Sequence, residues 1–254
     1  MKQLFLLIIM AATVAACQET PAPNAYIDAN GDCIFENNVV CYRINGASNP
    51  VVTSGMEAIF KAVIDKQEVV KDRKAAVAAS LNDGGSALVV EDSLVFPLEN
   101  FDSFEIVEQT PTLVTFKLTY PQWQVGEDNV GLVRTVTIRN GSYYCEVADV
   151  YSCDGSSERF TAVAGFAKRS SERSETGVDY MIDWETMTDG DGSYGIGIVA
   201  PMSGNLVFDG PDNSAVAYCT VKYGRKIEYA AGSCWSRAIS KCASVLSRIC
   251  LARS

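Results

Sequence analysis

The segment Asp183-Trp184-Glu185 combines the residue types and the spacing of a catalytic carboxylate pair. In a strand, successive side chains point to opposite faces, so Asp183 and Glu185 would share one face and Trp184 would occupy the other. Glycosidases use two carboxyl groups in this way. Tyr180 as an acid–base group and Arg134 as a cation for a uronate would serve a lyase. The alternative is a solvated acidic strand face, with Trp184 in the core.

Aromatic and charged side chains elsewhere supply candidates for binding a sugar. Aromatic rings offer faces for stacking, and charged groups hydrogen-bond hydroxyls or a uronate carboxylate. The candidate ligand-binding residues are Trp123, Trp184, Tyr120, Arg43, Glu36 and Lys168. Arg43 and Arg134 lie within apolar stretches, where an inward guanidinium needs a carboxylate partner. Glu36 or Glu185 could be that partner, and a structural ion pair explains these arginines as well as uronate binding does.

Histidine is absent from all 254 residues. Its absence excludes Ser-His-Asp and Cys-His nucleophile pairs and His-rich zinc sites. Acid–base chemistry is left to Asp, Glu, Tyr, Lys or Cys, and aldose epimerisation through a histidine is not expected. Asp28 to Asp32 imitates the start of a calcium loop, but Val39 stands at the twelfth position instead of Glu, so we predict a turn. We expect neither a metal nor a cofactor.

The elements that position these residues are predicted to be short antiparallel strands. Thr112–Tyr120 and Gly131–Arg139 alternate between apolar and polar residues, and Asn140-Gly141 after them is a hairpin signal. Similar short strands, separated by turns, recur through residues 26–235. The pattern predicts a mainly-β domain with an antiparallel β-sandwich or supersandwich architecture. Met56–Ile64 is ambiguous because its pattern is helix-like.

The N-terminus has the pattern of a bacterial lipoprotein signal. Lys2 is followed by an apolar stretch, Leu4–Val14, and then by small residues before Cys17, whose thiol would carry the lipid. The apolar stretch is shorter than the roughly 20 residues of a membrane-spanning helix. We therefore expect residues 1–16 to be a signal peptide, residues 17–25 a lipidated tether, and the protein to be anchored to the outer membrane. An ordinary secretory signal is the alternative.

Charge separates the body of the chain from its C-terminal tail. The formal net charge of −10 disfavours nucleic acid as a partner, because phosphate binding needs a basic surface. Residues 236–254 are instead basic and contain Cys242 and Cys250. This tail has three interpretations: a basic interfacial or docking helix, a terminal helix packed on the sandwich, or a non-native continuation after a frame change.

The chain has nine cysteines, and two pairs have the same spacing. Cys33 with Cys41, and Cys145 with Cys153, could each form a local disulfide in an oxidising compartment. The alternative is that these residues are free thiols buried in a β core.

Several short segments across residues 32–238 together form an ordered set of motifs. They are Phe35-Glu36-Asn37, Tyr42-Arg43-Ile44, Glu108 to Ile138, Trp184-Glu185 and Tyr229 to Ser236. The set resembles the bacterial lipoprotein family called domain of unknown function 4861. The resemblance implies a protein from Bacteroidetes with a galactose-mutarotase-like β-supersandwich fold. Members of the family are encoded among polysaccharide utilisation systems, and the resemblance implies no established activity. Because family members continue beyond Ala238, it also implies a chain shortened at its C-terminus.

The sequence as a whole favours an envelope lipoprotein that takes part in polysaccharide utilisation. We expect it to process glycans, as a glycosidase or lyase on uronate-containing chains. A non-catalytic glycan-binding lipoprotein is the first alternative, and a structural or inactive truncated protein is the second. The expected partners are a glycan and, through Cys17, the membrane.

Overall fold

The computed structural model describes residues 20–237 apart from five short internal segments, which are 65–66, 73–78, 170–172, 188–191 and 202–204. The predicted signal peptide, the lipidation site Cys17 and nearly all of the tail 236–254 lie outside the described residues. Within the described part of the chain, no helix is long and apolar enough to cross a membrane.

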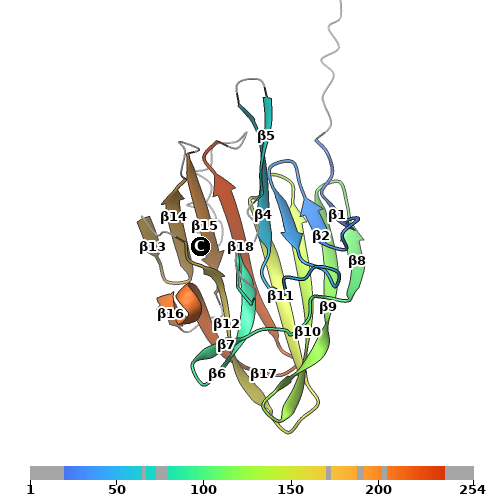
Figure 1. The fold of residues 1–254 in the computed structure, drawn as a ribbon, viewed down its shortest axis with the longest axis vertical. Helices are drawn as coiled ribbons and strands as arrows, with labels where there is room; N and C mark the ends of the chain where they lie inside the picture. The colour runs from blue at the N-terminus through green and yellow to red at the C-terminus, as the bar shows by residue number, and fades with distance from the viewer. Residues whose placement is uncertain are drawn as a thin grey trace, which may run out of the picture.

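Three antiparallel sheets form the fold (Figure 1). The first sheet has the order β1 (Asn24–Ile27), β2 (Cys33–Glu36), β3 (Cys41–Ile44), β4 (Glu57–Ile64) and β5 (Gln67–Asp72). The second has the order β13 (Arg173–Thr176), β14 (Tyr180–Thr186), β15 (Ser193–Val199), β18 (Lys226–Trp235), β11 (Tyr144–Cys153), β10 (Asp128–Arg139), β9 (Leu113–Val125) and β8 (Ser103–Gln109). The third has the order β16 (Asn205–Gly210), β17 (Ser214–Lys222), β12 (Arg159–Ala167), β6 (Gly85–Val90) and β7 (Ser93–Val95).

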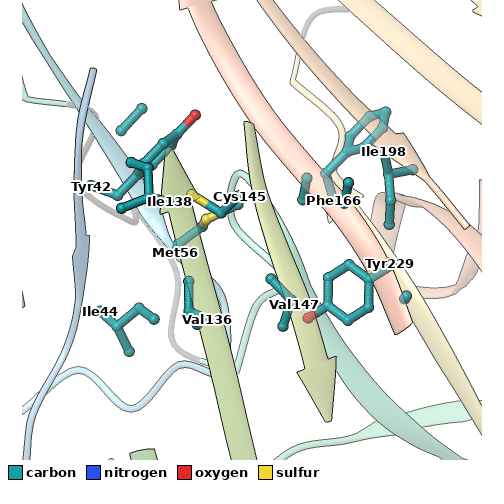
Figure 2. Packing of buried hydrophobic residues seen from close by; sticks show 14 of the residues in the cluster. Tyr42, Ile44, Met56, Val136, Ile138, Cys145, Val147, Phe166, Ile198 and Tyr229 are labelled. Atoms are coloured by element: carbon teal, nitrogen blue, oxygen red, sulfur yellow. The ribbon is translucent and has the colours of Figure 1, made fainter. Parts of the chain in front are cut away.

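One face of the second, eight-stranded sheet packs against both five-stranded sheets. Strands β1 and β4 of the first sheet contact β9 and β18, and β12 of the third sheet contacts β15. The shared core contains Tyr42 from the first sheet, Val136 and Val147 from the second, and Phe166 from the third (Figure 2). Burial on β9, β10 and β11 alternates along the strand, because every second side chain points into this core.

The mainly-β, antiparallel fold expected from the sequence is confirmed. The hairpin predicted at Asn140-Gly141 joins β10 to β11, and Gly141 has a φ of +77°, the left-handed conformation that glycine adopts without strain. The helix-like interpretation of Met56–Ile64 is wrong, because Glu57–Ile64 is strand β4. Apart from one short 3₁₀ turn at Pro211–Asn213, the described residues contain no helix.

Neither proposed local disulfide forms. Cys33 and Cys145 are buried free thiols, and Cys153 is a half-buried one. Cys145 and Cys153 lie at opposite ends of β11, and eight residues of extended chain separate them by roughly 26 Å. The alternative of buried free thiols in a β core is therefore confirmed for Cys33 and Cys145, whereas Cys234 is disulfide-bonded.

Candidate functional site

A polar groove lies on the outer face of the first sheet. Its volume is about 900 Å³. Three segments form it: the turn from Asp28 to Asp32, the loop from Asn45 to Val51, and the strand residues Arg43 and Glu57 at its base. Among the predicted ligand-binding residues, only Arg43 lines this groove.

An ion pair forms the base of the groove. Arg43 on β3 and Glu57 on β4 are direct cross-strand partners, so their side chains lie on the same face of the sheet. Arg43 donates to Oε2 of Glu57 from Nε, at 3.1 Å, and also from Nη2. Both side chains are largely buried, at 10% and 2% exposure. A carboxylate held in this way needs its charged partner, because desolvation without one is strongly unfavourable.

The walls of the groove are held in place by their own hydrogen bonds. Oδ1 of Asp28 accepts the backbone N–H groups of Asn30, at 2.8 Å, and of Asp32, at 3.0 Å. Asp32 in turn accepts the N–H of Gly46 at 3.0 Å and the amide of Asn49 at 3.3 Å. The first bonds close the turn, which confirms the prediction of a turn at Asp28 to Asp32. The second set ties this turn to the neighbouring loop, so the groove is formed before any ligand arrives.

Close packing of two glycines brings the walls together. A Cβ atom added at Gly46 would lie 1.7 Å from the carbonyl oxygen of Gly31. No other residue type therefore fits at position 46 without separating the turn from the loop. The described residues include no group of three or more His, Cys, Asp or Glu side chains arranged to hold a metal ion.

An exposed aromatic ring lies on the same face as the ion pair. Tyr26 on β1 pairs with Ile34 on β2, Ile34 pairs with Arg43, and Arg43 pairs with Glu57. Directly paired residues share a face, so these four side chains form one row across the sheet. Tyr26 is 40% exposed and lies two residues before Asp28 in the groove wall. It is therefore placed to stack on a ligand that extends from the groove.

The four predicted catalytic residues do not form one site. Asp183 and Glu185 share a face of β14, as expected, and line a small closed pocket with Tyr194 and Arg169. Tyr180 lies on the opposite face, where its hydroxyl donates to Glu175 at 2.6 Å. Arg134 is on β10, the fourth strand from β14 in the sheet, so roughly 19 Å of sheet separates it from β14.

The closed pocket at Asp183 and Glu185 leaves no room for a water molecule. Asp183 is 3% exposed, so the expectation of a solvated acidic strand face is wrong for this residue. Arg169 lies 3.5 Å from buried Asp83 and above the ring of Tyr194. Burial opposes the charge on Arg169, but Asp83, Tyr194 and Glu185 outweigh it and raise the pKa of Arg169. Of the charged residues that line the pocket, Asp183 is buried, whereas Arg169 and Glu185 are half-buried.

Arg134 belongs to a polar network buried in the core. It donates from Nε and Nη2 to the two carboxylate oxygens of Asp149, at 2.8 and 2.7 Å. The same carboxylate accepts the hydroxyl groups of Ser86, at 2.5 Å, and Tyr229, at 3.1 Å. The partners of Arg43 and Arg134 are thus Glu57 and Asp149, and the suggestion that Glu36 or Glu185 fills this role is wrong. A structural ion pair accounts for both arginines.

Two of the proposed sugar-binding aromatic residues lie in the core. Tyr120 is 2% exposed and Trp123 is 4% exposed, and the ring of Trp123 packs edge-on against Tyr151. Burial, together with nearby Asp149 and against the effect of Arg134, raises the pKa of Tyr120 to about 12. Neither ring has a face open to a ligand, which corrects their assignment as stacking platforms.

The remaining proposed ligand-binding residues lie apart from the groove. Trp184 is half-buried and its ring lies against Gly195 on the outer face of the second sheet. Lys168 pairs with Asp209 and lies over the ring of Phe208. Glu36 is on the outer face of β2, one row beyond the row of Arg43, and does not line the groove.

Sequence reasoning missed most of the groove. Glu57, Asn45, Asn49 and Tyr26 are not among the sequence candidates, and Asp28 to Asp32 is predicted from the sequence as a turn and not as part of a binding site. The available signal was Arg43 itself, because a guanidinium within an apolar strand requires a carboxylate on a neighbouring strand. Finding Glu57 in that role required the pairing of β3 with β4.

Comparison with known proteins gives one family match. The sequence profile of a family described as "Domain of unknown function (DUF4861)" matches residues 75–246, which begin after the groove residues. The comparison with curated proteins found no match. A solved structure titled "Putative kojibiose phosphorylase from human microbiome" is similar, with 6% sequence identity and a TM-score of 0.43 over 92% of this chain. The alignment covers 36% of that chain, so this protein spans about a third of its length.

Proposed function

The chain belongs to the DUF4861 family, a domain of unknown function, and from its own geometry we propose that it binds a carbohydrate in the groove between the Asp28–Asp32 turn and the Asn45–Val51 loop. The observation that carries this proposal is the preformed polar groove with the Arg43–Glu57 pair at its base. Its volume of about 900 Å³ lies within the range of small-molecule sites, roughly 300–1,000 Å³.

The chemistry of the lining favours a polyhydroxylated ligand. Amide and hydroxyl groups of Asn30, Asn45, Ser48 and Asn49 surround the groove together with the carboxylates of Asp28 and Asp32 and the ion pair. Such groups donate to and accept from the many hydroxyls of a sugar, and the exposed ring of Tyr26 supplies an apolar face beside them. Because the walls are already hydrogen-bonded to each other, little ordering is required when a ligand binds.

Binding without turnover is the form of this function that the geometry favours. The residues predicted to form a catalytic group are distributed over two faces of β14 and a distant strand. We further propose that the protein is a lipoprotein anchored through Cys17 to the outer membrane, where it takes part in polysaccharide utilisation. The basis for this address is the sequence of residues 1–17.

A second candidate function is cleavage of uronate-containing glycans at Asp183 and Glu185. The observation in its favour is that both carboxyl groups line one pocket beside Arg169. This function requires the pocket to open, because the closed form does not admit water. Release of sugar ends by the protein, and its loss in Glu185→Gln, would favour this candidate over binding alone.

The test of the proposed function is a titration of the purified protein against a panel of pectic, host and algal oligosaccharides. We expect one class to bind, and Tyr26→Ala to weaken its affinity about tenfold because the stacking face is lost. Tyr26→Phe, which keeps the ring, should bind normally. Ile27→Ala is the matched control, since Ile27 has the same 40% exposure on the same strand but points to the other face. Folded protein that binds no glycan would overturn the proposal.

A further inference from the structure

The groove has an excess of negative charge. Three carboxylates, those of Asp28, Asp32 and Glu57, line it together with one cationic side chain, Arg43, among the described lining residues. The charge of Arg43 is matched by Glu57, to which both Nε and Nη2 donate. Three carboxylates against one guanidinium give the lining a formal charge of −2.

We propose that the groove selects neutral or amino-bearing sugars and rejects uronates. This inference rests on the proposed function, because it specifies the ligand of the same groove. A uronate carboxylate would lie near Asp28 and Asp32 without a cation to receive it, since the guanidinium of Arg43 is already engaged by Glu57. Like charges placed together in a binding site are strongly unfavourable, so the carboxylates of Asp28 and Asp32 would repel a uronate.

The carboxylates cannot turn away from a ligand. Asp28 accepts two backbone N–H groups of its own turn, and Asp32 accepts the N–H of Gly46 and the side-chain amide of Asn49. Asp32 is 5% exposed, so its charge is poorly screened by water and salt. Both charges are therefore fixed features of the site, and they favour a hydroxyl or an ammonium group on the sugar over a carboxylate.

Matched ligand pairs test the inference. Each uronate-containing oligosaccharide of the panel is compared with its carboxyl-reduced form, which keeps the rings and linkages and replaces each carboxylate by a hydroxymethyl group. We expect the reduced form of the recognised class to bind at least about tenfold more tightly than the native form. Equal or tighter binding of the native form would overturn the inference and leave the proposed function standing. Folded protein that binds no member of the whole panel, native or reduced, would overturn both.

An isosteric variant tests whether a carboxylate of the groove causes the preference for the carboxyl-reduced ligand. Asp28→Asn keeps the Oδ1 acceptor for the N–H groups of Asn30 and Asp32 while removing one negative charge. It should narrow the preference for the reduced form by several-fold. Asp154→Asn is the control, since Asp154 also accepts a backbone N–H through Oδ1, that of Asn129, but lies outside the groove. Unchanged discrimination in Asp28→Asn, or the same change in both variants, would contradict the assignment to the groove.

Discussion

Arg134 and Asp149 are opposite charges buried side by side in the core, so each charge requires the other as its partner. Their side chains are 2% and 0% exposed, and the guanidinium also donates to the carbonyl oxygen of Ser54. Burial opposes the charge on Arg134, but Asp149 and the neighbouring tyrosines raise the pKa of Arg134 well above its ordinary value. Arg134 therefore keeps its charge, and each member of the pair is needed chiefly because the other is present.

Removing one member of this pair should be far more damaging than removing both. We predict that Arg134→Met lowers the free energy of unfolding by about 3–5 kcal/mol, because Asp149 is left as an uncompensated buried charge. The double variant with Asp149→Leu should recover much of that loss. Lys117→Ala, which breaks an exposed pair with Glu105, should cost no more than about 1 kcal/mol. Urea denaturation checks all three, and an Arg134→Met variant as stable as Lys117→Ala would contradict this account.

Buried tyrosines should make the fold sensitive to alkali. Burial raises the pKa of Tyr120 to about 12, and raises those of Tyr42 and Tyr229 well above their ordinary value. In the unfolded chain these hydroxyls lose their protons near about pH 10. Between about pH 10 and 12 the folded state thus holds protons that the unfolded state has lost, so stability falls as pH rises.

For Tyr120 alone the expected loss across that window is about 3 kcal/mol. Urea midpoints measured in steps from neutral pH upward should be flat below about pH 9 and then decline. Tyr120→Phe should reduce the slope of the decline, because one of the contributing hydroxyls is gone. A midpoint that does not change with pH beyond about 10 would show that these tyrosines are not protected from ionisation.

Strands in which apolar and polar residues alternate strictly were predictable from the sequence. The strand that supplies Glu57 at the base of the groove was not. Strands β9, β10 and β11 alternate cleanly because one of their faces packs on the core. On β4, Glu57 on the outward face and Ala58 on the inward face are both buried. The polarity of a residue on this strand therefore does not predict whether its side chain is buried. The sequence pattern of this segment is therefore helix-like, and it gives no signal that Glu57 is a buried partner of Arg43. The register that pairs it with Arg43 depends on long-range contacts.

The close contact between Gly46 and Gly31 should be required to keep the two walls of the groove in place. Gly46→Ala should push the Asn45–Val51 loop away from the Asp28–Asp32 turn, because the new Cβ would overlap the carbonyl oxygen of Gly31. We expect a loss of about 1–3 kcal/mol in stability and the loss of glycan binding. Gly141→Ala is the control: it meets no atom within 4 Å, and its φ of +77° should cost about 1 kcal/mol without changing binding. Normal glycan affinity in Gly46→Ala would contradict a preformed groove.

Taken as a whole, the molecule separates stability from recognition. The inner face of the eight-stranded sheet holds the Arg134 network and the shared core, and most of the residues predicted from sequence to bind sugar lie there or in isolated pairs. The groove lies on the outer face of the first sheet, where ligands have access. Types of residue were thus predictable, but their grouping was not, because three sheets must first be placed against each other.

The central claim is that a carbohydrate occupies the groove. A crystal structure of the protein with the oligosaccharide that binds most tightly tests it most directly. We expect a sugar between the Asp28–Asp32 turn and the Asn45–Val51 loop, with hydroxyls near the Arg43–Glu57 pair and a ring against Tyr26. A sugar bound at Trp184 on the outer face of the eight-stranded sheet, or in an opened pocket at Asp183 and Glu185, would contradict it.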